Sequence, residues 1–91
     1  MKAVVTVVGQ DRVGIIAKVS NTLAENKVNI LDLSQTILDS YFTMIMIVDI
    51  GNSEKSIKEL SELLDKNGSD IGVSIKIQHE DIFKTMHSVN D

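Results

Sequence analysis

The pattern of hydrophobic and polar positions along the chain predicts four strands and two helices. Lys2–Val8 and Tyr41–Ile50 are nearly unbroken apolar runs, the pattern typical of strands buried on both faces. Val28–Asp39 interleaves polar with apolar positions, and Asp70–Gln78 alternates strictly. Alternation of this kind predicts strands that expose one face or one edge.

A helical period separates the first strand from the second. Ile16, Val19 and Leu23 recur at three- and four-residue spacing, which predicts a helix ending at about Asn26. Asp11 precedes this helix as an expected N-cap, because its carboxylate can accept hydrogen bonds from free backbone amides.

A second helix is predicted between the third and fourth strands. Its apolar stripe consists of Ile57, Leu60 and Leu64. Asn52 or Ser53 is the expected N-cap, Asn67 the expected last residue, and Gly68 the expected left-handed residue that ends the helix.

The resulting order, βαββαβ, predicts an α+β ferredoxin-like sandwich. Right-handed crossovers place the first and third strands in the centre of a four-stranded antiparallel sheet, with both helices on one face. Residues 1–80 are expected to form this domain, and residues 81–91 a C-terminal tail that is either a short helix or a frayed terminus. The other sheet face has apolar positions and no obvious cover, which indicates association or a covering segment.

Charge and composition narrow the possible partners of this 91-residue chain. Its formal net charge of −4 argues against nucleic-acid binding, which needs a basic face. Cysteine is absent, which excludes disulfides and thiolate metal sites. The apolar start, Ala3–Val8, is too short for a signal-peptide core or a membrane span. We therefore expect a soluble cytoplasmic protein without a membrane partner.

The loop Gly9–Gly14 is the strongest candidate for chemistry. Its two glycines frame Asp11 and Arg12, and Arg12 is the one arginine in the sequence. A helix N-terminus can hold a carboxylate or phosphate, and an arginine can add a bidentate contact. The alternative is an ordinary tight turn with a cap and a solvated arginine. The spacing fits neither a dinucleotide-binding fingerprint nor a P-loop.

Asn29 begins the second strand and is the second candidate. Polar residues continue along the same strand at Asp32, Ser34, Gln35 and Thr36. They could flank a partner strand or a polar ligand if the strand lies at the edge of the sheet. The alternative for Asn29 is turn chemistry alone.

Catalytic and metal-binding patterns are weak. His79, Glu80, Asp81 and His87 do not share a helical spacing, so we predict neither a metal site nor a cofactor. No nucleophile elbow or acid–base pair indicates an enzyme.

The segment VVGQDRVGIIAKVSNTLAENKVNI resembles the signature of ACT domains, including those of the glycine cleavage system repressor. The resemblance covers about residues 2–80. It implies a ligand bound between two domains, at the first loop of one and the start of the second strand of the other. The residues it assigns to ligand binding are Gly9, Asp11, Arg12, Gly14 and Asn29. Gly9 stands where amino-acid-binding members often have a side chain that contacts the ligand.

Two functions are consistent with these patterns. The first is a non-enzymatic regulatory module that forms a homodimer and binds an amino acid or similar small metabolite at the subunit interface. The second is a protein-interaction or oligomerisation module with a vestigial ligand site, which docks a partner enzyme or regulator. A ligand response that depends on Asn29 would favour the first function.

Overall fold

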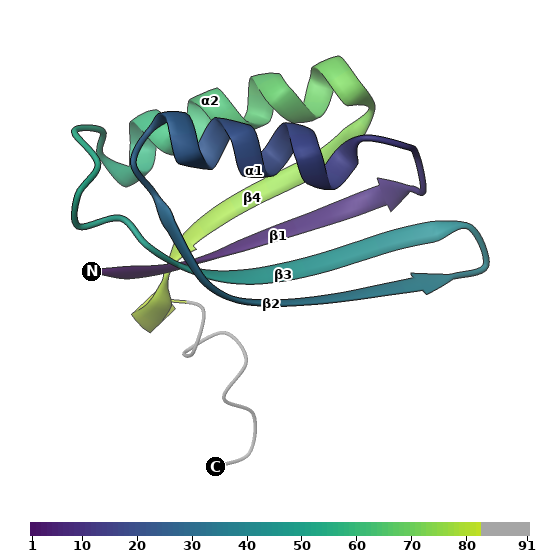
Figure 1. Cartoon of the computed structure of the whole chain (residues 1–91), viewed down its shortest axis with the longest axis horizontal. Coiled ribbons are helices and arrows are strands. Elements are labelled where there is room, and N and C mark those ends of the chain that lie inside the picture. Colours follow the sequence, from purple (N-terminus) through teal and green to yellow (C-terminus); the bar gives the residue numbers. More distant parts are fainter. Residues whose placement is uncertain (83–91) are drawn as a thin grey trace, which may run out of the picture.

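The computed structural model describes residues 1–82, so most of the C-terminal tail, expected over residues 81–91 as either a short helix or a frayed terminus, lies outside this part. The six expected elements are present in the expected order, which confirms the ferredoxin-like α+β fold (Figure 1). Their bounds are β1 Lys2–Gln10, α1 Ile15–Glu25, β2 Asn29–Leu38, β3 Tyr41–Asp49, α2 Ile57–Ile71 and β4 Val73–His79.

The sheet has the order β2-β3-β1-β4, and each neighbouring pair is antiparallel. The two nearly continuous apolar strands, β1 and β3, therefore lie in the centre, as predicted. Both helices cover the same face of the sheet (Figure 1). The two helices contact each other, α2 packs along β4, and the turn end of the β2–β3 hairpin extends past both helices (Figure 1).

The core lies between this sheet face and the two helices. Its fully buried side chains include Val5, Val7, Met44, Met46, Val48 and Ile75 from the strands and Val19, Leu23, Leu60 and Leu64 from the helices. Val4 and Val5 point to opposite faces of β1, yet only 2% and 0% of their surfaces are exposed. The middle of β1 is therefore buried on both faces.

A two-residue turn joins β2 to β3. Asp39 and Ser40 have φ angles of 50° and 71°, so both adopt the left-handed conformation that suits a tight hairpin turn. Near the other end of the hairpin, Ile30 pairs with Val48 and Asp32 pairs with Ile47. Leu31 is therefore an extra residue in β2, and this bulge decides which β2 side chains face the helices.

The start of α1 differs from the prediction. Its N-cap is Gly14, with a φ angle of 94° and no side-chain cap, so the expectation for Asp11 was wrong. The reason is that β1 continues to Gln10, two residues beyond its predicted end. Asp11 then lies against the hairpin turn instead of at the first helical turn.

Both ends of α2 also differ from the prediction. The helix begins after Ser56, which forms a capping box with Glu59, and it ends at Gly72 with a φ angle of 76°. Gly68 lies inside the helix, where a Cβ atom would come within 2.5 Å of the Val73 carbonyl oxygen. This glycine therefore permits the close approach of α2 to β4 instead of ending the helix.

Candidate functional site

The loop between β1 and α1 is fixed to the β2–β3 turn. The backbone amide of Asp11 donates a hydrogen bond of 2.8 Å to the carbonyl oxygen of Ser40. On the other side of the loop, the amide of Lys18 donates to the carbonyl oxygen of Gly14 at 2.9 Å and begins the helical ladder. Between these anchors, the side chain of Val13 is fully exposed. The loop therefore has fixed ends and an apolar tip.

Arg12 extends from this loop across the end of α2. A Cβ atom built on Gly72 would lie 3.5 Å from Cζ of the Arg12 guanidinium group. The C-terminal end of a helix carries partial negative charge, so it favours a cation at this position. Within residues 1–82, no carboxylate lies within 4.0 Å of Arg12 to form an ion pair. The guanidinium group therefore lies beside Gly72, the residue at which α2 ends.

A groove lies between this loop, α1 and the hairpin, and we call it the loop–hairpin groove. Its volume is about 530 Å³, within the range of roughly 300–1,000 Å³ typical of small-molecule sites. Its charged side chains are Asp11 and Arg12, and its neutral polar ones are Ser20 and Gln35. The remaining lining consists of Gly14, Ile15, Ile16, Ala17, Ile37 and Phe42.

Three of the five predicted site residues, Asp11, Arg12 and Gly14, meet at this groove. The sequence had indicated Gln35 only as one polar residue of an edge strand, and it had not indicated Ile37. Both face the helix side of the sheet because they pair with the buried Met44 and Phe42. The bulge in β2 sets this register, and no local sequence pattern predicts the bulge.

Gly9 has a packing role that the sequence did not reveal. It pairs with Val73 in β4, and a Cβ atom on Gly9 would lie 2.7 Å from Cγ1 of that valine. A side chain therefore does not fit at Gly9 unless Val73 moves. Gly9 is not among the residues that line the loop–hairpin groove.

Asn29 lies at the other end of β2, where it pairs with Asp49. Nine residue steps along a strand correspond to about 30 Å, so a single copy keeps Asn29 far from the loop of Asp11. Asn29 lines an open hollow of about 640 Å³ together with Lys27, Val28 and Asn52. In one chain, Asp11, Arg12 and Gly14 therefore lie together, whereas Asn29 is at the opposite end of β2 and Gly9 packs against β4.

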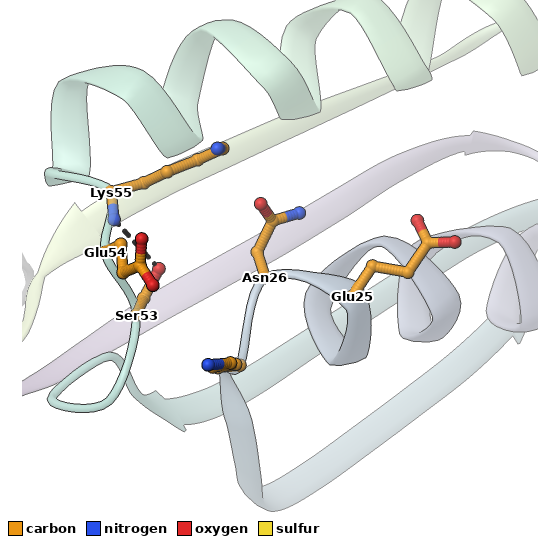
Figure 2. Close-up of a pocket in the computed structure, with 6 residues that line it drawn as sticks. Glu25, Asn26, Ser53, Glu54 and Lys55 are labelled. Atoms are coloured by element: carbon orange, nitrogen blue, oxygen red, sulfur yellow. Dashed lines mark hydrogen bonds between the residues drawn. The ribbon is translucent and has the colours of Figure 1, made fainter.

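A smaller pocket of about 160 Å³ lies at the C-terminal end of α1 (Figure 2). Glu25 and Asn26 approach it from α1, while Ser53, Glu54 and Lys55 come from the segment before α2. The backbone amide of Lys55 donates a hydrogen bond of 3.2 Å to Oγ of Ser53, which holds this segment in a local turn. The pocket contains charges of both signs and none of the predicted site residues, so we assign it no ligand.

Neither a metal cluster nor a membrane span is found within residues 1–82. No group of three histidine or acidic side chains in this part could hold a metal ion. His79 and Asp81 make a local contact, in which Nδ1 of His79 accepts a hydrogen bond of 3.1 Å from the backbone amide of Asp81. His87 lies outside the described residues. Neither α1 nor α2 has the length and apolar character needed to cross a membrane.

The fold and the loop agree with one family of known proteins. The sequence model of the ACT domain family matches residues 2–78. The chain belongs to the ACT domain family. A UPF0237 protein of Clostridium acetobutylicum is 56% identical over 89 residues, which cover 98% of this ACT domain and 100% of that protein.

Solved structures show the same relationship. An ACT domain protein from Streptococcus pneumoniae superposes with a TM-score of 0.82 at 43% identity and covers 92% of this chain and 94% of its own. A protein described as a candidate glycine cleavage system transcriptional repressor gives a TM-score of 0.74 at 25% identity, over 85% of this chain and 44% of that one. The resemblance to the ACT domains of such repressors is thereby confirmed.

Proposed function

We propose that this ACT domain is a non-enzymatic regulatory module that dimerises through β2 and binds an amino acid or similar small metabolite at the subunit interface. The similarity to a candidate transcriptional repressor supports a regulatory role. A cytoplasmic location is part of the same proposal.

The edge strand β2 is the observation that carries the proposal. Nine of its ten residues are exposed, and Ile30 is the one half-buried exception. The exposed residues include four large apolar side chains: Leu31, Leu33, Ile37 and Leu38. Natural edge strands are usually protected by charge, proline or a covering element, and β2 has one charged residue, Asp32, and no proline. A long apolar edge of this kind is suited to pairing with another strand.

Pairing of two β2 strands would also complete the predicted site. An antiparallel pair with a two-fold axis at Ser34 places Asn29 of one copy opposite Asp39 of the other. Asp39 precedes Ser40, whose carbonyl oxygen accepts the amide of Asp11. Each loop–hairpin groove would then lie close to Asn29 of the partner subunit, and a two-fold dimer would contain two equivalent sites.

The charges at the groove suit an amino acid. Arg12 can bind a carboxylate through two parallel hydrogen bonds, and Asp11 can accept from an ammonium group. Within residues 1–82 neither side chain is engaged in an ion pair. To reach a ligand in the groove, the Arg12 side chain would turn away from Gly72 at the end of α2, beside which its guanidinium group lies.

Introducing a charge at the proposed two-fold axis tests whether two β2 strands pair in a dimer. Ser34 is exposed on β2, and Ser34→Lys would bring two cations together only if two β2 strands pair. Ser74→Lys is the matched control, because Ser74 is exposed on the other edge strand, β4. We expect sedimentation equilibrium to show a dimer for the wild type and for Ser74→Lys, and a monomer for Ser34→Lys. A Ser34→Lys dimer as stable as the wild type would exclude this interface.

A thermal-shift titration with the twenty amino acids tests the ligand. We expect at least one of them to raise the melting temperature of the wild type but not that of Arg12→Ala. If the folded dimer responds to none of them, the proposal of an amino-acid sensor is wrong.

The alternative, a protein-interaction module, has its own support on the sheet face that carries no helix. Val8 and Ile45 are 43% and 39% exposed there, although they belong to the two central strands. A partner that binds this face would be lost on the double substitution of Val8 and Ile45 by serine, while the dimer persists. Retention of the partner by this variant would exclude the face as its binding surface.

A further inference from the structure

The sheet face that carries no helix is buried at one end and open at the other. The strand pairing arranges its side chains in rows that cross β3, β1 and β4. In the row of Val4, that valine is 2% exposed, and its neighbours Ile47 and Gln78 are half-buried. Four residues further along β1, all three side chains of the row are exposed: Thr43, Val8 and Ser74. Burial on this face therefore decreases along β1.

The sheet alone does not account for the burial of Val4. Val4 and Val8 are valines on the same face of the same central strand, and β3 and β4 flank both of them. Val4 is also not part of the core cluster between the sheet and the helices. Its neighbours Ile47 and Gln78 are themselves half-buried, so the cover extends over them as well. This end of the face therefore needs a covering segment from outside the sheet.

The chain leaves β4 at the buried end of this face. His79, the last residue of β4, pairs with Ala3, the residue next to Val4. Residues 80–82 then form a helical turn on the side of the sheet away from α1 and α2 (Figure 1). Nδ1 of His79 accepts the backbone amide of Asp81, as an N-cap side chain does. The described part of the chain therefore ends in a helical turn next to the row of Val4.

The sequence that follows suits an apolar cover. Apolar residues recur there at three- and four-residue spacing, which is typical of one side of a helix: Ile82, Phe83, Met86 and Val89. A helix from residue 80 to residue 91 would be about 18 Å long, and the step from Val4 to Val8 is about 13 Å. The segment therefore has both the length and the apolar side chains to reach the open end of the face.

We propose that residues 83–91 pack on the open part of this face, over Thr6, Val8 and Ile45, and close it in the free protein. This proposal does not depend on the proposed function, because pairing through β2 uses the edge of the sheet and leaves this face uncovered. A partner protein that binds the face would have to displace residues 83–91 first. The C-terminal segment would then control access to the face.

An introduced cysteine can measure access to this face, because the chain has no cysteine of its own. Val8→Cys places a thiol at the open end of the face. Val13→Cys places a thiol on the fully exposed tip of the loop between β1 and α1, and it serves as the reference. The measurement is the rate at which a maleimide labels each thiol in the full-length chain.

Two double substitutions then test the C-terminal segment. We expect Phe83→Ser/Met86→Ser to raise the labelling rate of Val8→Cys at least fivefold and to leave that of Val13→Cys unchanged. The matched control, Lys84→Ser/His87→Ser, has the same spacing outside the apolar stripe and should change neither rate.

Two results would overturn the proposal. If Val8→Cys is labelled at the same rate with the native segment and with Phe83→Ser/Met86→Ser, the face is open in the free protein and is left to a partner protein. If labelling slows as the protein concentration rises, whichever C-terminal segment is present, a second copy of the chain covers the face.

A nitroxide label on Asn90→Cys locates the segment without altering its apolar residues. We expect the label to broaden the amide NMR signals of Val8 and Ile45. The signal of Glu62 should remain sharp, because this exposed residue belongs to α2, on the other side of the sheet. Signals of Val8 and Ile45 that are equally sharp with the oxidised and the reduced label would contradict the packing.

Discussion

Asn67 of α2 donates a hydrogen bond of 2.9 Å from Nδ2 to Oγ1 of Thr22 in α1. Both residues are buried, with 8% of the surface of each exposed, and the Thr22 hydroxyl group in turn donates to the carbonyl oxygen of Lys18 at 3.1 Å. A buried polar pair of this kind is stable only when the two helices keep their relative positions. The bond therefore fixes how α1 and α2 lie on the sheet.

Replacing Thr22 with valine should destabilise the fold. The amide of Asn67 would lose its acceptor inside the protein, and an unsatisfied buried polar group costs about 1–3 kcal/mol. We expect urea unfolding to show a decrease of this size in the free energy of unfolding. Thr22→Ser keeps the hydroxyl group and should cost less. A Thr22→Val variant as stable as the wild type would show that the bond does not hold the helices.

Gly68→Ala should also destabilise the protein, although alanine favours helices over glycine. The new Cβ atom would lie 2.5 Å from the carbonyl oxygen of Val73, so α2 must move away from β4. Overpacking of this kind costs about 1–3 kcal/mol. Ser69→Ala is the control, because Ser69 is exposed in the same helix. Urea unfolding that gives equal stabilities for the two variants would contradict the close contact.

The same glycine shows how far the sequence determined the fold. Periodicity predicted every element and the central strands, because the buried and half-buried strands have different patterns. It placed the end of α2 at Asn67, since a glycine after a helical stripe usually ends the helix. The contact of Gly68 with Val73 is a tertiary one, and no local pattern distinguishes a packing glycine from a terminating one.

The candidate site was predictable in part for a similar reason. Asp11, Arg12 and Gly14 are neighbours in sequence, so their proximity in the loop follows directly. The contribution of Gln35 and Ile37 depends on the bulge in β2, which shifts the alternation by one residue. The distance between Asn29 and the loop follows from the length of β2, which is why the proposed site includes a second copy of the chain.

The capping box of α2 should make stability depend on pH. The hydrogen bond from the Ser56 backbone amide to the carboxylate lowers the pKa of Glu59, and the Ser56 side chain and the nearby Lys55 lower it further. The stabilisation is therefore complete above the unfolded-state pKa of glutamate, about 4.3, and is lost as the pH falls through the lower folded-state pKa.

Glu59→Gln isolates this contribution, because the glutamine oxygen can still accept the Ser56 amide but does not titrate. We expect the wild type to be the more stable of the two near neutral pH, and the difference to shrink in urea unfolding as the pH is lowered from about 6 to 3. A difference that stays constant with pH would contradict the assigned cause. Ser56→Ala removes the cap and should cost about 1 kcal/mol.

Gly9→Ala separates the packing role of Gly9 from the ligand contact implied at this position. The added Cβ atom would lie 2.7 Å from Cγ1 of Val73, so we expect a loss of about 1–3 kcal/mol in the free energy of unfolding without any ligand present. Val73→Ala removes the Cγ1 atom that is closest to the new methyl group. Gly9→Ala should therefore cost less in the Val73→Ala background than in the wild type, because contacting residues are not additive. Equal costs in the two backgrounds, measured by urea unfolding, would show that Val73 is not what excludes a side chain at Gly9.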